Sequence, residues 1–193
     1  MADAAARVLP ELGDELARYP GSLGYEPMRK VMADRFERRE GVPMPVERTA
    51  LTTGSMQAVT LMAQYFVKKP GDVILLEEFT YSGTIGAYNK QGAKLVGVEI
   101  DEQGMRMDSL VEKIEACTKE GNKPTFIYAL VTYQNPTGSI MPLERRKELL
   151  EIAARYDIPV VEDHCYADTI YDEHHVPALI TIKSDATVFH IES

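Results

Sequence analysis

The sequence holds little of what marks a secreted, membrane-bound or nucleic-acid-binding protein. It has only two cysteines, Cys117 and Cys165, which is too few for a disulfide framework, so a reducing cytoplasm is the expected compartment. The first residues have neither the basic nor the apolar segment of a signal peptide. No apolar run approaches the roughly 18 residues that span a bilayer. A formal net charge of -9 argues against nucleic acids and anionic membranes as partners.

The apolar residues that are present suffice for one good-sized core and follow a regular order. Hydrophobic residues make up 45% of the chain and charged residues 26%, as in ordinary globular proteins. We expect strands over residues 50–53, 73–76, 94–100, 125–131, 158–161 and 187–191. We expect helices over residues 2–17, 27–40, 55–67, 82–91, 107–119 and 142–156. This alternation predicts an α/β fold with a mostly parallel sheet covered by helices on both faces.

Several unusual patches follow the expected strands directly. Gly54 and Ser55 come after the first strand, Asn135 soon after a later one, Asp163 after the next, and Ser193 after the last. In folds of this class, ligands bind at the carboxyl ends of the strands. The shared placement therefore predicts a single binding site.

The segment Gly54-Ser55-Met56 suits a phosphate group. A strand, a glycine and a helix start present free backbone N–H groups and the positive end of a helix dipole. A plain N-cap serine behind a turn glycine is the alternative. The segment has neither the G-x-G-x-x-G nor the G-x-x-x-x-G-K-[ST] fingerprint, so the dinucleotide and P-loop interpretations lack support.

The later patches suit a heteroaromatic ring. A carboxylate such as Asp163, buried beside a ring nitrogen, would keep that nitrogen protonated. Asn135 stands in the string Asn-Pro-Thr-Gly, which fixes a turn and could aim its amide at a ring oxygen, and Tyr166 could donate to the same oxygen. Tyr81 could stack on the ring face. A capping aspartate, a simple turn and core tyrosines are the corresponding structural alternatives.

Taken together, these strings resemble the class I/II aminotransferases, which are fold-type I enzymes that depend on pyridoxal 5′-phosphate (PLP). The matches are in order at residues 19–24, 52–58, 70–72, 79–81, 134–138 and 163–166. The resemblance implies a three-layer α/β/α large domain and transfer of an amino group between an amino acid and a 2-oxo acid. Residues 1–18 would then be an N-terminal helical segment, and residues 19–193 part of the PLP-binding domain.

The resemblance implies five positions that contact the phosphate of PLP. Gly54, Ser55 and Met56 correspond to the family's phosphate cradle, and Ser193 to a further phosphate contact. Tyr19 corresponds to a tyrosine that reaches the phosphate bound in the neighbouring subunit, which implies a homodimer.

Four further positions correspond to residues around the PLP ring. Tyr81 matches the stacking aromatic residue, and Asp163 matches the partner of the pyridine nitrogen. Asn135 and Tyr166 match the pair that holds the phenolic oxygen.

The sequence departs from the family's pattern near residue 193. The family's Schiff-base lysine would follow Ser193 within a few positions, so we expect no catalytic residue within the sequence and an inactive fragment. Lys183, the nearest lysine, is expected in a solvent-exposed loop and does not replace it. Glu192 stands where the family has a small residue, and its negative charge would disfavour a phosphate.

Other interpretations are kept beside this one. The chain could be a non-catalytic aminotransferase-like module that senses an effector, or another fold-type I enzyme such as a lyase or a decarboxylase. A metal site is a further alternative, but no H-E-x-x-H or C-x-x-C spacing supports it, and we expect none. Its candidate ligands would be Asp163, His164, Cys165, Asp168, Asp172, His174 and His175.

Overall fold

The computed structural model describes residues 1–166, 168–169 and 175–193, and the chain divides into two compact units. The first unit is Met1–Leu51 and the second is Thr52–Ser193. The boundary expected after residue 18 falls inside the first unit, and the assignment of residues 19–193 to one PLP-binding domain stays a prediction.

The first unit is helical. It consists of α1 (Ala2–Leu12), the 3-10 helix η1 (Gly13–Ala17), α2 (Glu26–Glu40) and the 3-10 helix η2 (Val46–Arg48). The helix expected over residues 2–17 changes type at Gly13, whose φ of 48° ends α1. The predicted limits of α2 are confirmed: Pro27 lies in its first turn, and Gly41 caps it in the left-handed conformation.

The second unit is built on a five-stranded parallel sheet in the order β2-β1-β5-β6-β7. The strands are β1 (Val73–Glu77), β2 (Lys94–Val98), β5 (Phe126–Ala129), β6 (Val160–Asp163) and β7 (Val188–Ile191). β1, β5 and β6 are buried along their whole length, as the continuous apolar runs predict. In the β6–β7 pair, Glu162 lies opposite His190 and Asp163 opposite Ile191.

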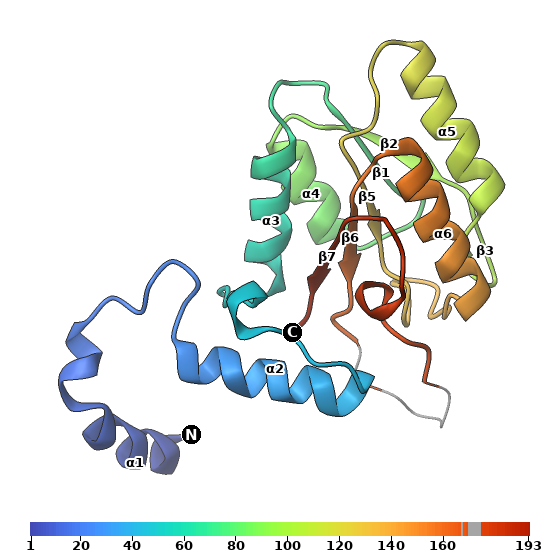
Figure 1. Cartoon of the computed structure of the whole chain (residues 1–193). Coiled ribbons are helices and arrows are strands. Elements are labelled where there is room, and N and C mark those ends of the chain that lie inside the picture. Colours follow the sequence, from blue (N-terminus) through green and yellow to red (C-terminus); the bar gives the residue numbers. More distant parts are fainter. Residues whose placement is uncertain (167, 170–174) are drawn as a thin grey trace. The chain divides into compact units, whose positions relative to one another are not determined.

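Helices cover both faces of this sheet, so the three-layer α/β/α fold predicted from the sequence is confirmed (Figure 1). One face carries α3 (Ser55–Phe66) and α4 (Ser82–Lys90), and the other carries α5 (Met107–Lys119) and α6 (Leu143–Tyr156). The core is accordingly divided into two clusters by the sheet. Successive strand residues point to opposite faces of the sheet: Val161 packs in the cluster on the α3/α4 side, and Val160 packs in the cluster on the α5/α6 side.

The structure differs from the sequence prediction in several places. Residues 50–53 are not a strand, because none of the described strands pairs with them; the N–H of Leu51 instead bonds the carbonyl of Leu23. A short hairpin, β3 (Ile100–Asp101) and β4 (Gly104–Met105), and a 3-10 helix, η3 (Leu179–Thr181), were not foreseen. β6 also runs two residues further than expected, so Asp163 ends the strand and does not follow it.

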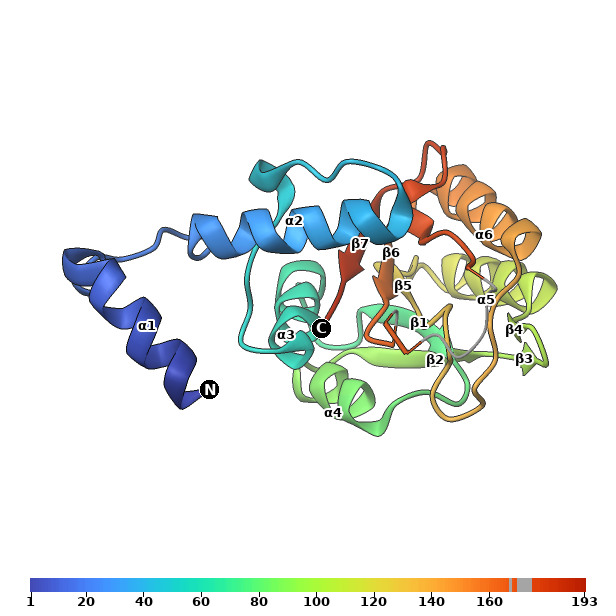
Figure 2. The ribbon, with the colours of Figure 1, turned by 90° about the horizontal axis from the view of Figure 1, so that it is seen from below.

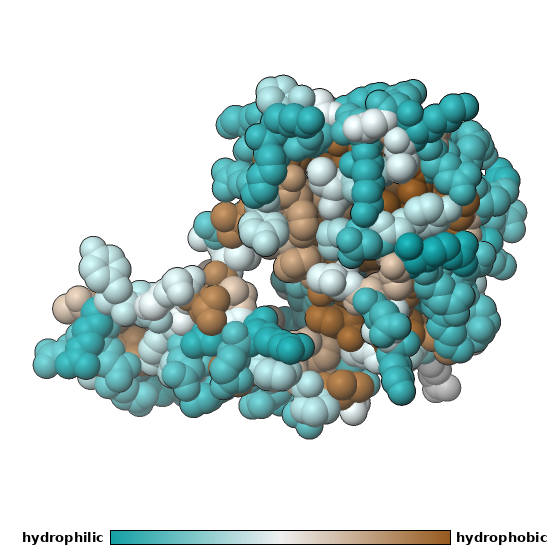
Figure 3. Space-filling model, turned by 45° about the horizontal axis from the view of Figure 1, so that its top comes forward, coloured by the Kyte–Doolittle hydropathy of each residue, from teal (hydrophilic) through white to brown (hydrophobic). Residues whose placement is uncertain are grey.

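The surface view agrees with the charged composition. Hydrophilic residues cover most of the face seen in Figure 3, and hydrophobic residues show in smaller patches between them. Within the described residues, no helix combines the length and the apolar character that crossing a membrane requires.

Candidate functional site

The predicted site residues of the second unit lie at the carboxyl ends of the parallel strands. Asn135 is in the loop after β5, Asp163 ends β6, and Ser193 follows β7. α3 and α4 begin at this same edge of the sheet, and the end of β7 lies beside the start of α3 in both ribbon views (Figures 1 and 2). Tyr81 immediately precedes α4 and Gly54 immediately precedes α3. The parallel topology therefore gathers segments that are far apart in the sequence.

Asn135 and Tyr166 are in direct contact. The Asn135 Nδ2 donates a hydrogen bond of 3.1 Å to the Tyr166 hydroxyl. Gln134 holds the turn: its Nε2 donates to the Phe79 carbonyl at 2.6 Å, and its Oε1 accepts from the Thr137 hydroxyl at 2.7 Å. The two residues that the sequence assigns to one ring oxygen are thus close enough to share an acceptor.

Asp163 is a buried carboxylate that faces hydrogen-bond donors. The Tyr128 hydroxyl donates to its Oδ2 at 2.6 Å, and the Cys165 N–H donates to its Oδ1 at 3.3 Å. Thr84 lies 3.2 Å from the Tyr128 oxygen, and because the single phenol proton points to Asp163, the Thr84 hydroxyl is the donor there. Burial and the nearby carboxylate raise the pKa of Tyr128 well above its usual value, so the phenol keeps its proton. Both oxygens of Asp163 therefore accept hydrogen bonds.

The sequence alone did not indicate Tyr128 or Thr84. Both are completely buried, and they stand in an expected strand and an expected helix where a polar side chain looks like ordinary packing. The available signal was a tyrosine inside an otherwise apolar strand, which needs a hydrogen-bond partner when it is buried.

The start of α3 is open to an anion. Gly54 has a φ of 76°, which favours glycine, and a side chain there would meet no atom within 4 Å. The first N–H groups of a helix have no partner within it, and the first turn of α3 contains no acidic residue. The Gln57 side chain accepts from the Thr53 N–H, while Ser55 is half-buried. The glycine and the helix start on which the phosphate prediction depends are in place, and the phosphate role itself stays a prediction.

Tyr81 lies against the first turn of α4. A Cβ added to Gly83 would come within 2.4 Å of the Tyr81 Cε1, so the ring rests where Gly83 has no side chain. The Tyr81 side chain is still 43% exposed. Its ring is consequently held in place and yet accessible, which suits a stacking residue.

The end of β7 is tied to the segment that follows Asp163. The His164 N–H bonds the Ile191 carbonyl at 2.8 Å, and the Ser193 hydroxyl donates to the Cys165 carbonyl at 3.5 Å. Burial and the neighbouring Asp163 raise the pKa of Cys165 to about 12, so it is a thiol and not a thiolate nucleophile.

Two further sequence predictions concern Tyr19 and Lys183. Tyr19 belongs to the first unit, where its side chain is fully exposed, and its role at a neighbouring subunit stays a prediction. Lys183 is exposed, as expected, and precedes β7 at the amino end of that strand.

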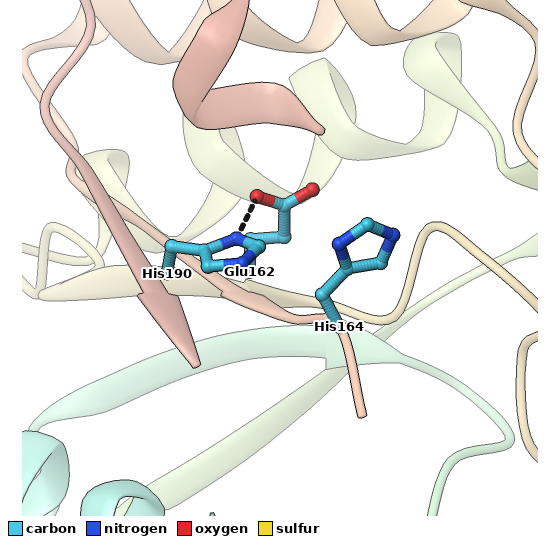
Figure 4. Close-up of side chains that lie close together, drawn as sticks. All are labelled: Glu162, His164 and His190. Atoms are coloured by element: carbon cyan, nitrogen blue, oxygen red, sulfur yellow. Dashed lines mark hydrogen bonds and ion pairs between the residues drawn. The ribbon is translucent and has the colours of Figure 1, made fainter. Parts of the chain in front are cut away.

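A buried group of charged side chains lies on the α5/α6 side of β6 and β7 (Figure 4). Glu162 Oε2 and His190 Nδ1 are 2.7 Å apart, and the Leu179 N–H donates to Glu162 Oε1 at 2.8 Å. Burial alone would lower the pKa of His190 and raise that of Glu162. The attraction between the two charges outweighs it, raising the pKa of His190 to about 9 and lowering that of Glu162 to about 2. The pair is therefore ionised at neutral pH.

His164 completes this group, which also bears on the metal alternative. The ligand atoms of Glu162, His164 and His190 lie within 4.8 Å of one another. Because Glu162 and His190 already share a hydrogen bond, we interpret the group as a buried ion pair. Of the ligands considered from the sequence, only His164 belongs to it. Asp168 and His175 are exposed, and Asp172 and His174 lie outside the described residues.

Arg146 lies in a charged helix and is nevertheless completely buried, which the sequence did not indicate. Its guanidinium donates to the carbonyls of Met141, Val131 and Pro177 and to the Thr132 hydroxyl, at 2.8 to 2.9 Å. It thus fixes the backbone on both sides of the Asn135 turn.

Glu77 is a second buried carboxyl group that the sequence did not single out. It ends β1, and its Oε1 accepts the Leu130 N–H at 3.1 Å. Burial raises the pKa of Glu77 to about 8, although this hydrogen bond and others oppose the shift.

Comparison with known proteins identifies a family for this chain. The family model for aminotransferases of class I and II matches residues 1–193. The chain is 32% identical to aromatic-amino-acid aminotransferase 1 of Thermococcus litoralis, over 95% of this chain and 44% of that protein. It is 34% identical to the 2-aminoadipate transaminase of Thermus thermophilus, over 96% of this chain and 44% of that protein.

Solved structures agree. An archaeal alanine:glyoxylate aminotransferase superposes with a TM-score of 0.91 at 32% identity, covering 100% of this chain and 47% of that one. The α-aminoadipate aminotransferase of Thermus thermophilus, solved with N-(5′-phosphopyridoxyl)-L-leucine, gives a TM-score of 0.79 at 35% identity, covering 93% and 43%. The chain thus spans less than half the length of the relatives it matches.

Proposed function

The chain belongs to the class I and II aminotransferase family, and from this premise we propose that it binds PLP and serves amino-group transfer between an amino acid and a 2-oxo acid. The resemblance inferred from the motifs is confirmed by the family match. The observation that carries the proposal is the contact between Asn135 and Tyr166, three residues beyond the buried carboxylate of Asp163.

Asp163 would accept a hydrogen bond from the protonated ring nitrogen. PLP, when bound, supplies an electron-withdrawing ring that stabilises negative charge at the α-carbon of the substrate. Tyr128 donates to Asp163, and Thr84 donates to the Tyr128 oxygen, so this chain of hydrogen bonds holds the carboxylate in one orientation. An ionised carboxylate is the state that keeps a proton on the ring nitrogen.

The remaining predicted residues would bind and orient the cofactor. Asn135 and Tyr166 would donate to the phenolic oxygen, which their mutual contact allows. Ser55 and the first N–H groups of α3 would bind the phosphate, with Ser193 as a further contact. Tyr81 would cover one face of the ring.

We extend the proposal to assembly and location. A homodimer is supported by the exposed Tyr19, which corresponds to a residue that reaches a neighbouring subunit in this family. A cytoplasmic location is supported by the low cysteine content.

Cofactor binding is tested by titrating residues 1–193 with PLP and following the absorbance of the cofactor. Asp163→Asn should weaken binding by about tenfold or more, because a neutral amide cannot stabilise a protonated nitrogen as a carboxylate does. Lys183→Ala, an exposed control, should bind as the unchanged protein does. Equal affinity in the Asp163→Asn variant would overturn the proposal.

The class of reaction is tested in a fusion of residues 1–193 to the remaining part of one of the relatives. With an amino acid and a 2-oxo acid supplied, amino-group transfer produces a second amino acid. Release of carbon dioxide without a new amino acid would indicate a decarboxylase instead.

A further inference from the structure

Glu192 poses a problem for the proposed phosphate site. It directly precedes Ser193, and a carboxylate at that point would repel a phosphate dianion. The end of β7 lies beside the start of α3, so any charge there acts on both proposed phosphate contacts (Figures 1 and 2).

The structure turns the Glu192 side chain toward His190. Glu192 Oε2 lies 3.5 Å from His190 Nε2, and only 11% of the Glu192 side chain is exposed. His190 is opposite Glu162 in the sheet and packs on the α5/α6 side, whereas Ile191 joins the core cluster under α3. Glu192 follows the last residue of β7, and its contact with His190 places its carboxylate on the same side as the His190 ring.

His190 therefore carries one positive charge between two carboxylates. Glu162 holds its Nδ1 at 2.7 Å (Figure 4). On the other side of the ring, Glu192 faces its Nε2 at 3.5 Å. We infer that His190 draws the Glu192 carboxylate away from the phosphate position beside Ser193, and so makes a phosphate site compatible with a glutamate at position 192. This inference rests on the proposed function, because it takes Ser193 and the start of α3 as the phosphate contacts.

The surroundings of His190 favour its charged form. Among the described residues, the titratable groups that face it are Glu162 from β6, Glu192 from its own strand, and the His164 ring, whose centroid lies 5.3 Å away. The far nitrogen of His164 is engaged by the Thr132 hydroxyl at 3.0 Å, which in turn accepts from Arg146. The raised pKa of His190, about 9, keeps the imidazolium charged across the neutral range.

The test is a double-mutant cycle read by binding. Residues 1–193 and the variants His190→Gln, Glu192→Gln and His190→Gln/Glu192→Gln are titrated with PLP and, separately, with pyridoxal, which lacks the phosphate. His190→Gln should weaken PLP binding by roughly tenfold and leave pyridoxal binding unchanged, because only the phosphate meets the released carboxylate. Glu192→Gln should bind PLP at least as tightly as the unchanged chain. The double variant should recover that affinity, because the repelling charge is gone.

Two further measurements secure the result. His190→Gln leaves Glu162 buried without its partner and can unfold the protein, so the same comparison is made in a Glu162→Gln/His190→Gln background, with and without Glu192→Gln. His175→Gln and Glu151→Gln, at exposed positions, control for the loss of a histidine and of one negative charge.

The outcomes separate the two proposals. If the unchanged chain prefers PLP over pyridoxal but His190→Gln keeps that preference, or if Glu192→Gln fails to restore it, the role of His190 is wrong while the phosphate site stands. If the unchanged chain shows no preference for PLP over pyridoxal, the proposed phosphate site is wrong, and the inference about His190 is wrong as well.

Discussion

The phenol of Tyr128 on β5 donates a hydrogen bond of 2.6 Å to Oδ2 of Asp163 on the adjacent strand β6. The two residues are 35 positions apart in sequence, and both are buried. The Asp163 carboxylate at the proposed cofactor site is thus oriented by Tyr128 from the neighbouring strand.

Tyr128→Phe should lower the free energy of unfolding by about 1.5–3 kcal/mol, because it removes a hydrogen bond to a charged group. Chemical denaturation at neutral pH measures the change. Tyr88→Phe is the matched control: its ring packs against Tyr128, but its hydroxyl has no hydrogen-bond partner among the described residues. Tyr88→Phe should be nearly neutral, and an equal loss in both variants would contradict the role given to Tyr128.

The Glu162–His190 pair predicts a pH range of stability. The folded-state pKa of His190 is raised from its ordinary 6.5 to about 9, so its contribution is complete below pH 6.5 and is lost as pH rises through 9. The pKa of Glu162 is lowered from 4.5 to about 2, so its contribution is complete above pH 4.5 and is lost as pH falls toward 2. Unfolding free energies measured from pH 3 to 10 should flatten in Glu162→Gln/His190→Gln. Unchanged curvature would show that the pair does not act in this way.

Glu77 adds a separate dependence of stability between pH 4.5 and about pH 8. Its folded-state pKa is raised from 4.5 to about 8, so its stabilising contribution is complete below pH 4.5 and is lost as pH rises through 8. Glu77→Gln keeps an oxygen for the Leu130 N–H and cannot ionise. As the pH rises from 5 to 9, the free energy of unfolding of this variant should increase by a few kcal/mol relative to that of the unchanged protein. A constant difference over that range would mean that Glu77 does not titrate with a raised pKa.

The neighbouring residues Arg145 and Arg146 show how burial changes the contribution of an arginine to stability. Arg146→Met should lower the free energy of unfolding by about 3 kcal/mol or more, because several buried carbonyls lose their donor at once. Arg145 on the same helix is only partly buried and pairs with Asp101 of β3, so Arg145→Met should lower the free energy of unfolding by less than about 1 kcal/mol. Denaturant unfolding of the two variants measures the contrast, and similar costs would argue against the structural role of Arg146.

Much of the fold was predictable because local patterns carry it. The continuous apolar run of β1 and the stripe of α5 give strand and helix at nearly their observed limits, and their alternation leads to a parallel sheet. Residues 50–53 were predicted wrongly, because a strand needs a neighbour that a local pattern does not reveal.

The candidate site likewise has some features that the sequence predicts and others that it does not. By itself, the sequence determined the order of the main elements and placed Ser55 at the start of a helix, with Asn135 and Asp163 at strand ends, because turn chemistry and periodicity act over a few residues. Only the tertiary structure decided that Tyr128 faces Asp163, that Arg146 is buried, and that His190 stands between Glu162 and Glu192. These contacts depend on strand register and on the face to which each side chain turns, and pairing between distant segments sets both.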